Sequence, residues 1–290
     1  MALAANTEPA GVESYCNGTS KFVSQTNEGM MNVRIMSDDA EKEASSFSTS
    51  AMRLEELARH EDPYVREKVA RNPKTPVETL MQLLEDKAPQ VRAGGARNRN
   101  TPEHKLRALA KEESAYVRSA VAANPNTPIE LLAKMSEDGD AIVRASAARS
   151  PSIPVKCLTY LATDGNYGVR WKVAIHTKTP PGVLAQLAYD ENSWVRGGVA
   201  GNPSMAVLSI LEMFAKDTEA DVRMGVARNE NSPVELLQKL ALDEEESVRW
   251  SVAMNPKTPT QTLDVLITDN EEWVRRRARR NKRNRELVAE

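Results

Sequence analysis

The residue types that carry acid–base, nucleophilic or metal chemistry are sparse in this sequence. The 290 residues include three histidines and two cysteines, namely His60, His104, His176, Cys16 and Cys157. Their spacing fits neither a metal site nor a catalytic triad, and the sequence contains no glycine-rich phosphate loop. We therefore predict a protein that is not an enzyme and that has no catalytic residue, no metal site and no cofactor.

Aromatic and basic residues, by contrast, recur at fixed positions around a repeated Val-Arg dipeptide. The dipeptide begins nine times, at intervals of 26 residues with one interval of 27. These repeat valines are Val65, Val91, Val117, Val143, Val169, Val195, Val222, Val248 and Val274. The recurrence indicates a repeat protein, because self-similarity at a fixed period marks stacked supersecondary units.

Ten aromatic and basic residues occupy three positions of this repeat. The position before the repeat valine, the second after it and the sixth after it lie on one arc of a helix, opposite the buried side. The residues are Tyr64, Tyr116, Trp194 and Trp273 at the first position, Trp171 and Trp250 at the second, and Arg71, Arg97, Arg149 and Arg228 at the third. We name this arc the aromatic–basic stripe. Exposed tryptophan and arginine are common interface anchors, so we predict that these ten residues bind a partner.

Structural roles for the same residues are the alternative. Trp171 with Trp194, and Trp250 with Trp273, come from adjacent repeats and are 23 residues apart in each case. Such pairs could staple neighbouring repeats together instead of contacting a partner. The arginines of the stripe fall in the last helical turn, where a cation interacts favourably with free carbonyl groups.

Each repeat carries the signals of two short helices. An asparagine seven residues after the repeat valine, usually followed by proline, predicts a helix that ends in the left-handed conformation. Three residues later, Thr-Pro or Ser-Pro predicts the N-cap of the next helix, with Glu78, Glu130 and Glu235 completing capping boxes. An acidic residue five positions before the repeat valine predicts a cap for the second helix. With the arginine of the dipeptide it also predicts a ladder between repeats, in which each exposed ion pair contributes ~0–1 kcal/mol.

Stacking of these short helices determines the expected fold. Helices of about ten residues are marginal in isolation, so they must bury their apolar faces against neighbouring repeats. We predict an all-α protein, a right-handed α-solenoid of nine short helix pairs over residues 48–285. Residues 1–47 are expected to form an N-terminal arm, either flexible or an irregular cap, and residues 286–290 a C-terminal tail.

The residue pattern of the repeat resembles that of known helical repeats. The pattern D-x4-V-R resembles HEAT repeats, and NPxTPxELLxxLAxD is similar to the variant leucine-rich repeat, a bacterial HEAT-like family. The resemblance implies stacked short helices, of which the second can be a 3₁₀ helix, and a binding scaffold whose partner it leaves open. The best-known member adds a cysteine-rich iron–sulfur segment. The two distant cysteines of this chain cannot ligate such a cluster, so no equivalent segment is expected.

Composition narrows the choice of partner and compartment. The net charge is −2, with 40% hydrophobic and 28% charged residues. No run of about 18 apolar residues could span a membrane, and the first residues lack the features of a secretory signal. We therefore predict a cytoplasmic location. A protein or peptide is the partner we favour, because the negative net charge argues against a generally basic nucleic-acid binder.

Two other functions are kept as alternatives. A nucleic-acid-binding solenoid would use the arginines of the stripe and the basic C-terminal repeat, where residues 271–290 hold eight basic and four acidic side chains. That repeat is either a polar cap or a phosphate-binding patch. Some HEAT-like folds have DNA glycosylase or lyase activity, but no spacing in this chain singles out an acid for such chemistry.

Overall fold

Helices alone make up the regular structure of residues 38–289, the part of the chain that the computed structural model describes. A helix at residues 38–45 precedes nine helix pairs within this range. The first helices of the pairs are α2 (Ala51–Leu57), α4 (Val77–Leu83), α6 (Glu103–Leu109), α8 (Ile129–Met135), α10 (Val155–Leu161), α12 (Pro181–Leu187), α14 (Leu208–Phe214), α16 (Val234–Leu240) and α18 (Thr260–Leu266). The second helices are α3 (Pro63–Arg71), α5 (Pro89–Arg97), α7 (Ala115–Ala122), α9 (Ala141–Arg149), α11 (Tyr167–Ala174), α13 (Ser193–Ala200), α15 (Ala220–Arg228), α17 (Glu246–Met254) and α19 (Glu272–Ala289).

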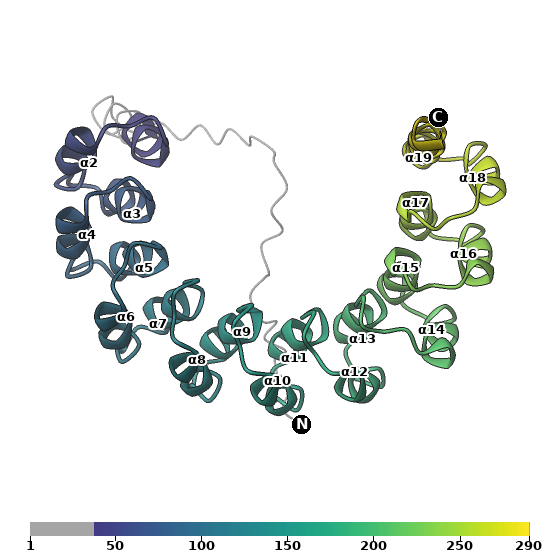
Figure 1. The fold of residues 1–290 in the computed structure, drawn as a ribbon, viewed down its shortest axis with the longest axis horizontal. Helices are drawn as coiled ribbons and strands as arrows, with labels where there is room; N and C mark the ends of the chain where they lie inside the picture. The colour runs from purple at the N-terminus through teal and green to yellow at the C-terminus, as the bar shows by residue number, and fades with distance from the viewer. Residues whose placement is uncertain (1–37, 290) are drawn as a thin grey trace, which may run out of the picture.

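The pairs stack side by side into an arc of two layers. Figure 1 shows the odd-numbered helices from α3 to α19 on the inner, concave side and the even-numbered helices on the outer side. Each odd-numbered helix packs against the next one along the chain. The predicted all-α solenoid is therefore confirmed. The second helices are α-helical, not 3₁₀, in this structure.

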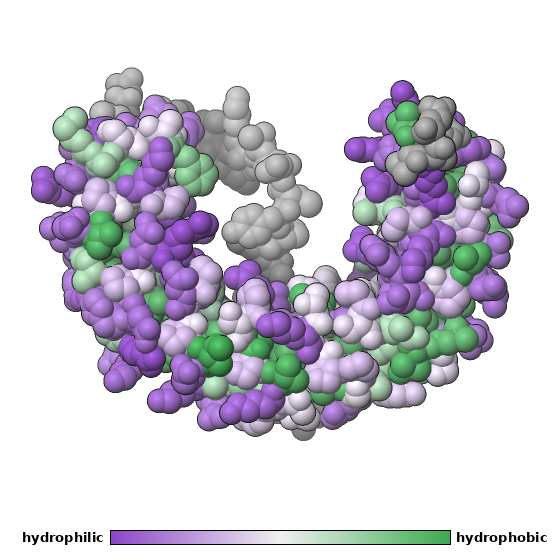
Figure 2. All heavy atoms as spheres, in the orientation of Figure 1, coloured by the Kyte–Doolittle hydropathy of each residue, from purple (hydrophilic) through white to green (hydrophobic). Residues whose placement is uncertain are grey.

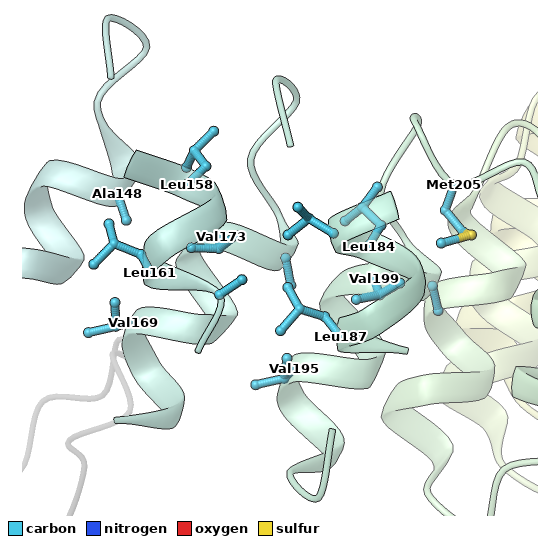
Figure 3. Packing of buried hydrophobic residues seen from close by; sticks show 14 of the residues in the cluster. Ala148, Leu158, Leu161, Val169, Val173, Leu184, Leu187, Val195, Val199 and Met205 are labelled. Atoms are coloured by element: carbon cyan, nitrogen blue, oxygen red, sulfur yellow. The ribbon is translucent and has the colours of Figure 1, made fainter. Parts of the chain in front are cut away.

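The core runs along the arc between the two layers. In the repeat of Val169, the valine, Val173 and Ala174 are fully buried, and they pack with Leu158 and Leu161 of α10. Figure 3 shows Val169 and Val173 of α11 beside Leu158 and Leu161 of α10. Equivalent residues form one continuous cluster from Leu80 to Ala278. Helices of seven to nine residues gain their stability from this packing, because they are too short to be stable alone.

The repeated asparagine connects neighbouring repeats, and our prediction of a left-handed helix end was wrong. Asn98 has φ −68° and ψ 129°, and no described residue has a positive φ. Its buried side-chain amide donates to the carbonyl oxygens of Ala70 (2.8 Å) and Asn72 (2.9 Å) in the preceding repeat. Its Oδ1 accepts the N–H of Asn100. The same donation to the preceding repeat is made by Asn72, Asn124, Asn202, Asn229, Asn255 and Asn281.

The repeated threonine is also not the cap that we predicted. Thr101 is buried, and its hydroxyl donates to the carbonyl oxygen of Gly95 at 2.6 Å, at the end of α5. The following helices with expected capping boxes at Glu78, Glu130 and Glu235 have no side-chain hydrogen bond at the N-cap, which is the proline. A buried hydroxyl must find an acceptor, and the carbonyl of Gly95, which also accepts the N–H of Asn98, supplies it at the end of the preceding helix.

The predicted arginine ladder is confirmed, and its pairs are more buried than expected. Arg170 donates from Nε and Nη2 to both carboxylate oxygens of Asp190 at 2.6 and 2.9 Å, and the side chains are 11% and 7% exposed. Asp190 also accepts the N–H of Asn192, so the acid orders the turn while Asn192 itself is the N-cap. In the described chain the ladder pairs are Arg66–Asp86, Arg92–Glu112, Arg118–Asp138, Arg144–Asp164, Arg170–Asp190, Arg196–Asp217, Arg223–Asp243 and Arg249–Asp269.

Both ends of the solenoid differ from the simple repeat. The helix at residues 38–45 lies in the segment that we assigned to the arm, and it packs on α3 through the fully buried Ala44. The carbonyl of Ala44 accepts the amide of Asn72, as a preceding repeat would. The rest of the predicted arm, residues 1–37, lies outside the described residues. At the other end, α19 continues through the boundary that we expected after residue 285.

Candidate binding site

The ten residues of the aromatic–basic stripe all lie on odd-numbered helices, which line the concave side of the arc (Figure 1). Their burial divides them by position in the repeat. The aromatic residues before the repeat valine are exposed, with Trp194 at 58%. Trp171 and Trp250, two residues after the valine, are partly buried and pack against the core. The stripe is thus one surface, but only part of it is free to contact a partner.

The tryptophans of the last two repeats contact each other. The ring centroids of Trp250 and Trp273 are 5.9 Å apart, with the planes tilted by 41°. This is the geometry expected for a stabilising aromatic pair. The contact joins α17 to α19, so at this end of the solenoid the two tryptophans connect adjacent repeats, as the structural alternative predicted.

The tryptophans of the central repeats have a different arrangement. No comparable ring contact joins Trp171 to Trp194 in the described part of the chain. Instead, both residues line two hollows of the surface, one on each side of Trp171. We name the first the glycine hollow; it measures about 330 Å³ and includes Trp171, Trp194, Gly197, Gly201, Met224 and Arg228 in its lining. We name the second the lysine hollow; it measures about 660 Å³ and includes Ile142, Ala145, Tyr167, Trp171, Lys172 and Trp194.

Glycines create the first hollow. Gly197 and Gly201 stand two and six residues after Val195, where other repeats carry tryptophan or arginine. Gly225 allows α13 and α15 to approach closely, because a Cβ there would lie 2.6 Å from the carbonyl oxygen of Gly197. Our sequence reasoning missed this hollow. The signal that could have revealed it is the loss of side chains at two stripe positions of a single repeat.

Lys172 forms part of the wall of the second hollow. Its Nζ lies 3.9 Å from the ring centroid of Trp171, which is a cation–π arrangement. Burial lowers the pKa of Lys172, and the nearby charge of Arg149 lowers it further. The lysine therefore presents a partly desolvated positive charge beside an apolar surface.

The four arginines of the stripe do not form a uniform row of free cations. Arg71 pairs with the buried carboxylate of Glu67 at 3.2 Å. The guanidinium of Arg97 lies 5.0 Å from the ring centroid of Tyr116. A third arginine, Arg228, donates to the hydroxyl of Ser251 at 3.3 Å, while Arg149 is exposed. Two of the four cations are thus engaged with neighbouring side chains of opposite charge or with an aromatic ring.

The histidine at position 176 serves the scaffold. It replaces the repeated asparagine, with its Nε2 3.2 Å from the carbonyl oxygen of Ser150 and its Nδ1 accepting the N–H of Lys178. Burial lowers the pKa of His176. Within residues 38–289 no cluster of three or more histidine, cysteine or acidic residues could hold a metal ion. In the same range no helix is both long enough and apolar enough to cross a membrane.

The fold and its stacked pairs define a helical repeat scaffold. A family model described as leucine rich repeat variant matches residues 63–87, which include the first Val-Arg dipeptide and the ladder acid Asp86. The pattern of that segment recurs in phase through the chain, so the resemblance to variant leucine-rich repeats is confirmed. Among curated proteins, none matches this chain.

Two solved structures illustrate the likeness. One is described as a leucine-rich repeat variant with a novel repetitive protein structural motif; it is 27% identical, with 77% of this chain and 88% of that chain covered and a TM-score of 0.48. An engineered protein is 18% identical, with 89% and 96% covered and a TM-score of 0.38. Because both scores are below 0.5, the fold class rests on the helices of this chain itself.

Proposed function

We propose that this chain is a non-enzymatic scaffold that binds a protein or peptide along the concave side of its odd-numbered helices. The observation that supports this proposal is the pair of hollows on either side of Trp171, bounded by the exposed ring of Trp194. Concave, mostly apolar sites with a few polar groups at the rim are typical of ligand recognition, and solenoids commonly bind along their concave surface.

The chemistry of the two hollows suggests what kind of peptide they accept. Most of their lining residues are aromatic, aliphatic or glycine, so bulky apolar side chains would gain the most from entering. The charged lining residues are Lys172 in the lysine hollow and the pair Arg228 and Asp221 in the glycine hollow. We therefore propose a segment that presents two bulky apolar side chains, with a carboxylate placed beside Lys172 in the lysine hollow, which has no acid in its lining.

Nucleic acid is the less favoured partner. Binding to a phosphate backbone relies on many free cations, whereas Arg71 is paired with Glu67 and Arg97 stacks on Tyr116. The glycine hollow also contains the carboxylate of Asp221, which would repel phosphate. A glycosylase or lyase would need a buried acid of raised pKa in the groove, and Asp221 is exposed.

Filling the glycine hollow tests the proposal. In Gly201→Leu the new Cβ meets no atom closer than 3.5 Å, so the Cβ itself causes no clash, and the rest of the side chain would occupy part of the hollow. The matched control is Gly182→Leu on the outer helix α12, where a Cβ meets nothing within 4 Å. Random peptides displayed on phage would be selected on the wild-type chain and then tested on both variants. We expect selected peptides to lose about tenfold or more in affinity for Gly201→Leu, the loss of one buried apolar contact, and to bind Gly182→Leu normally.

Two results would count against a peptide scaffold. Selected peptides that bind Gly201→Leu as tightly as the wild type would place their contact outside the glycine hollow. A mobility shift of single-stranded or duplex DNA that is strong at low salt and lost at high salt would favour the nucleic-acid alternative instead.

A further inference from the structure

A third hollow lies at the end of the solenoid, where α19 packs on α17. It measures about 500 Å³ and is lined by Met254, Pro256, Arg277, Arg280, Asn281, Asn284 and Arg285. We name it the arginine pocket. All charged side chains among these lining residues are arginines. Figure 2 shows hydrophilic side chains on the inner side of the C-terminal end of the arc.

One arginine of the pocket is held in place by the protein. Arg285 donates from Nε to Oδ1 of Asn281 at 3.2 Å and from Nη2 to the carbonyl oxygen of Pro256. Burial lowers the pKa of its guanidinium, which means that the charged form is poorly solvated where it lies. An anion in the pocket would compensate this charge.

The other two arginines lack an acidic partner among the described residues. The Nε of Arg277 is buried and has no hydrogen-bond acceptor. Arg280 is exposed and forms no ion pair within this range. Elsewhere on the same helix, Arg276 pairs with Glu272 at 2.6 Å, and Lys282 pairs with Asp264 at 2.6 Å. Arg279 and Arg283, also outside the pocket, form no ion pair among the described residues, so what distinguishes Arg277 is its buried Nε without an acceptor.

Asn281 belongs to the asparagine ladder and Arg280 stands where four other repeats carry arginine, but the repeat does not require Arg277, Asn284 or Arg285. Three positions after the repeat valine the other copies carry glycine, alanine, serine or lysine, and only the last copy has an arginine, Arg277. Asn284 and Arg285 lie on the part of α19 that extends beyond the ends of the other second helices. A terminal repeat needs a polar outer face, but not a group of unpaired arginines around one hollow.

We propose that the arginine pocket binds a phosphate group, carried by a phosphorylated protein as a phosphomonoester or present as the free ion. A guanidinium donates two parallel N–H bonds to an oxyanion, and a phosphomonoester offers three strong acceptor oxygens with a charge close to −2 at neutral pH. Bound there, the phosphate would accept from Arg277 and Arg280 and offset most of the positive charge of the three neighbouring guanidinium groups. The amide of Asn284 is a further donor in the lining.

Calorimetric titration of the full chain with inorganic phosphate at fixed ionic strength tests the pocket. The pocket variant is Arg277→Gln with Arg280→Gln, and the matched control is Arg276→Gln with Arg283→Gln, which removes the same charge from the same helix outside the lining. We expect saturable binding to the wild type and a loss of about tenfold or more in the pocket variant, because hydrogen bonds to charged groups are the strong ones. Circular dichroism would verify that both variants are folded.

Two outcomes of this titration overturn the proposal. Equal weakening in the pocket variant and the control would mean that phosphate responds only to the net charge of α19. Absence of saturable binding to the folded wild-type chain would mean that the pocket is no phosphate site. Either result leaves the proposed peptide site untouched, because the glycine hollow lies between α11 and α15 and shares no lining residue with this pocket.

The source of the phosphate is determined with a second ligand. A short neutral peptide that contains one phosphoserine would be titrated beside its unphosphorylated copy. Tighter binding of the phosphopeptide than of inorganic phosphate would identify a phosphorylated protein as the source, and the reverse order would identify the free ion. In both cases the unphosphorylated peptide should not bind to the pocket, and binding by that copy at equal strength would contradict the proposal.

Discussion

The indole rings of Trp250 and Trp273 lie in contact, 5.9 Å apart between centroids, and connect the last two inner helices. Trp171 and Trp194 occupy the same two positions of their repeats, yet they border two hollows. Residues at the same position of different repeats therefore do not make the same contacts. The first pair joins two repeats through a ring contact, and the second pair borders open surface.

Truncation of single tryptophans should separate these roles. Trp250→Ala removes a ring that packs on the core and on Trp273, and we expect it to lower the free energy of unfolding by about 2–4 kcal/mol. Trp194→Ala removes a ring that is 58% exposed, and it should cost about 1 kcal/mol or less. Urea denaturation followed by circular dichroism measures both. Equal losses of stability in the two variants would contradict the assignment.

The asparagine ladder is interrupted at Ser150, whose hydroxyl accepts the N–H of Ser152 at 3.4 Å and offers no amide to the preceding repeat. By the register of the ladder, an asparagine there would reach the carbonyl oxygens of Ala122 and Asn124. We expect Ser150→Asn to raise the free energy of unfolding by about 1–2 kcal/mol through two new hydrogen bonds. The reverse change, Asn124→Ser, should lower it by a similar amount or more. A Ser150→Asn variant that melts at a lower temperature than the wild type would refute the register.

His176 should make the middle of the solenoid sensitive to mild acid. Burial lowers its pKa in the folded state, so the unfolded chain binds the proton more readily. Stability should therefore fall as the pH decreases below about 6.5, the usual histidine value, and continue to fall until the lowered folded pKa is reached. His176→Asn restores the repeat residue and should flatten this part of the curve. Melting temperatures of wild type and variant between neutral and mildly acidic pH provide the measurement.

The arginine ladder should govern stability at lower pH. Burial opposes ionisation of Asp190, but the guanidinium of Arg170 and the N–H of Asn192 outweigh it, and the net pKa is lowered. A lowered carboxyl pKa contributes stability above the unfolded value of about 4, and this contribution is lost as the pH falls further. Acid unfolding below about pH 4 is therefore expected to persist in His176→Asn.

A matched pair of substitutions checks the ladder at neutral pH. Asp190→Asn leaves the nearly buried Arg170 without its carboxylate and should cost about 3 kcal/mol. Glu191→Gln removes an exposed carboxylate 3.4 Å from the same arginine, with a side chain that is 88% exposed, and it should cost less than about 1 kcal/mol. A loss from Glu191→Gln as large as that from Asp190→Asn would mean that burial does not decide the strength of these pairs.

Much of the fold could be predicted because each repeat meets the same physical demands. The sequence alone predicted the 26-residue period and the buried valines. It also predicted that the dipeptide arginine pairs with an acid of the next repeat. Local rules failed for Asn98 and Thr101. The buried Asn98 side chain finds its acceptor in the preceding repeat, and the buried Thr101 hydroxyl finds its acceptor at the end of the preceding helix. Capping preferences consider only the helix that follows, so they did not identify these partners.

The sequence by itself determined a helical solenoid and the arc on which its aromatic and basic residues lie. The tertiary structure alone decided which residues of that arc are occupied with one another and which surround an open hollow. Stacking brings side chains from three consecutive repeats to one place, as Trp171, Gly201 and Arg228 show in the glycine hollow. The size of a hollow depends on all three repeats together, and no single period of the sequence contains that information.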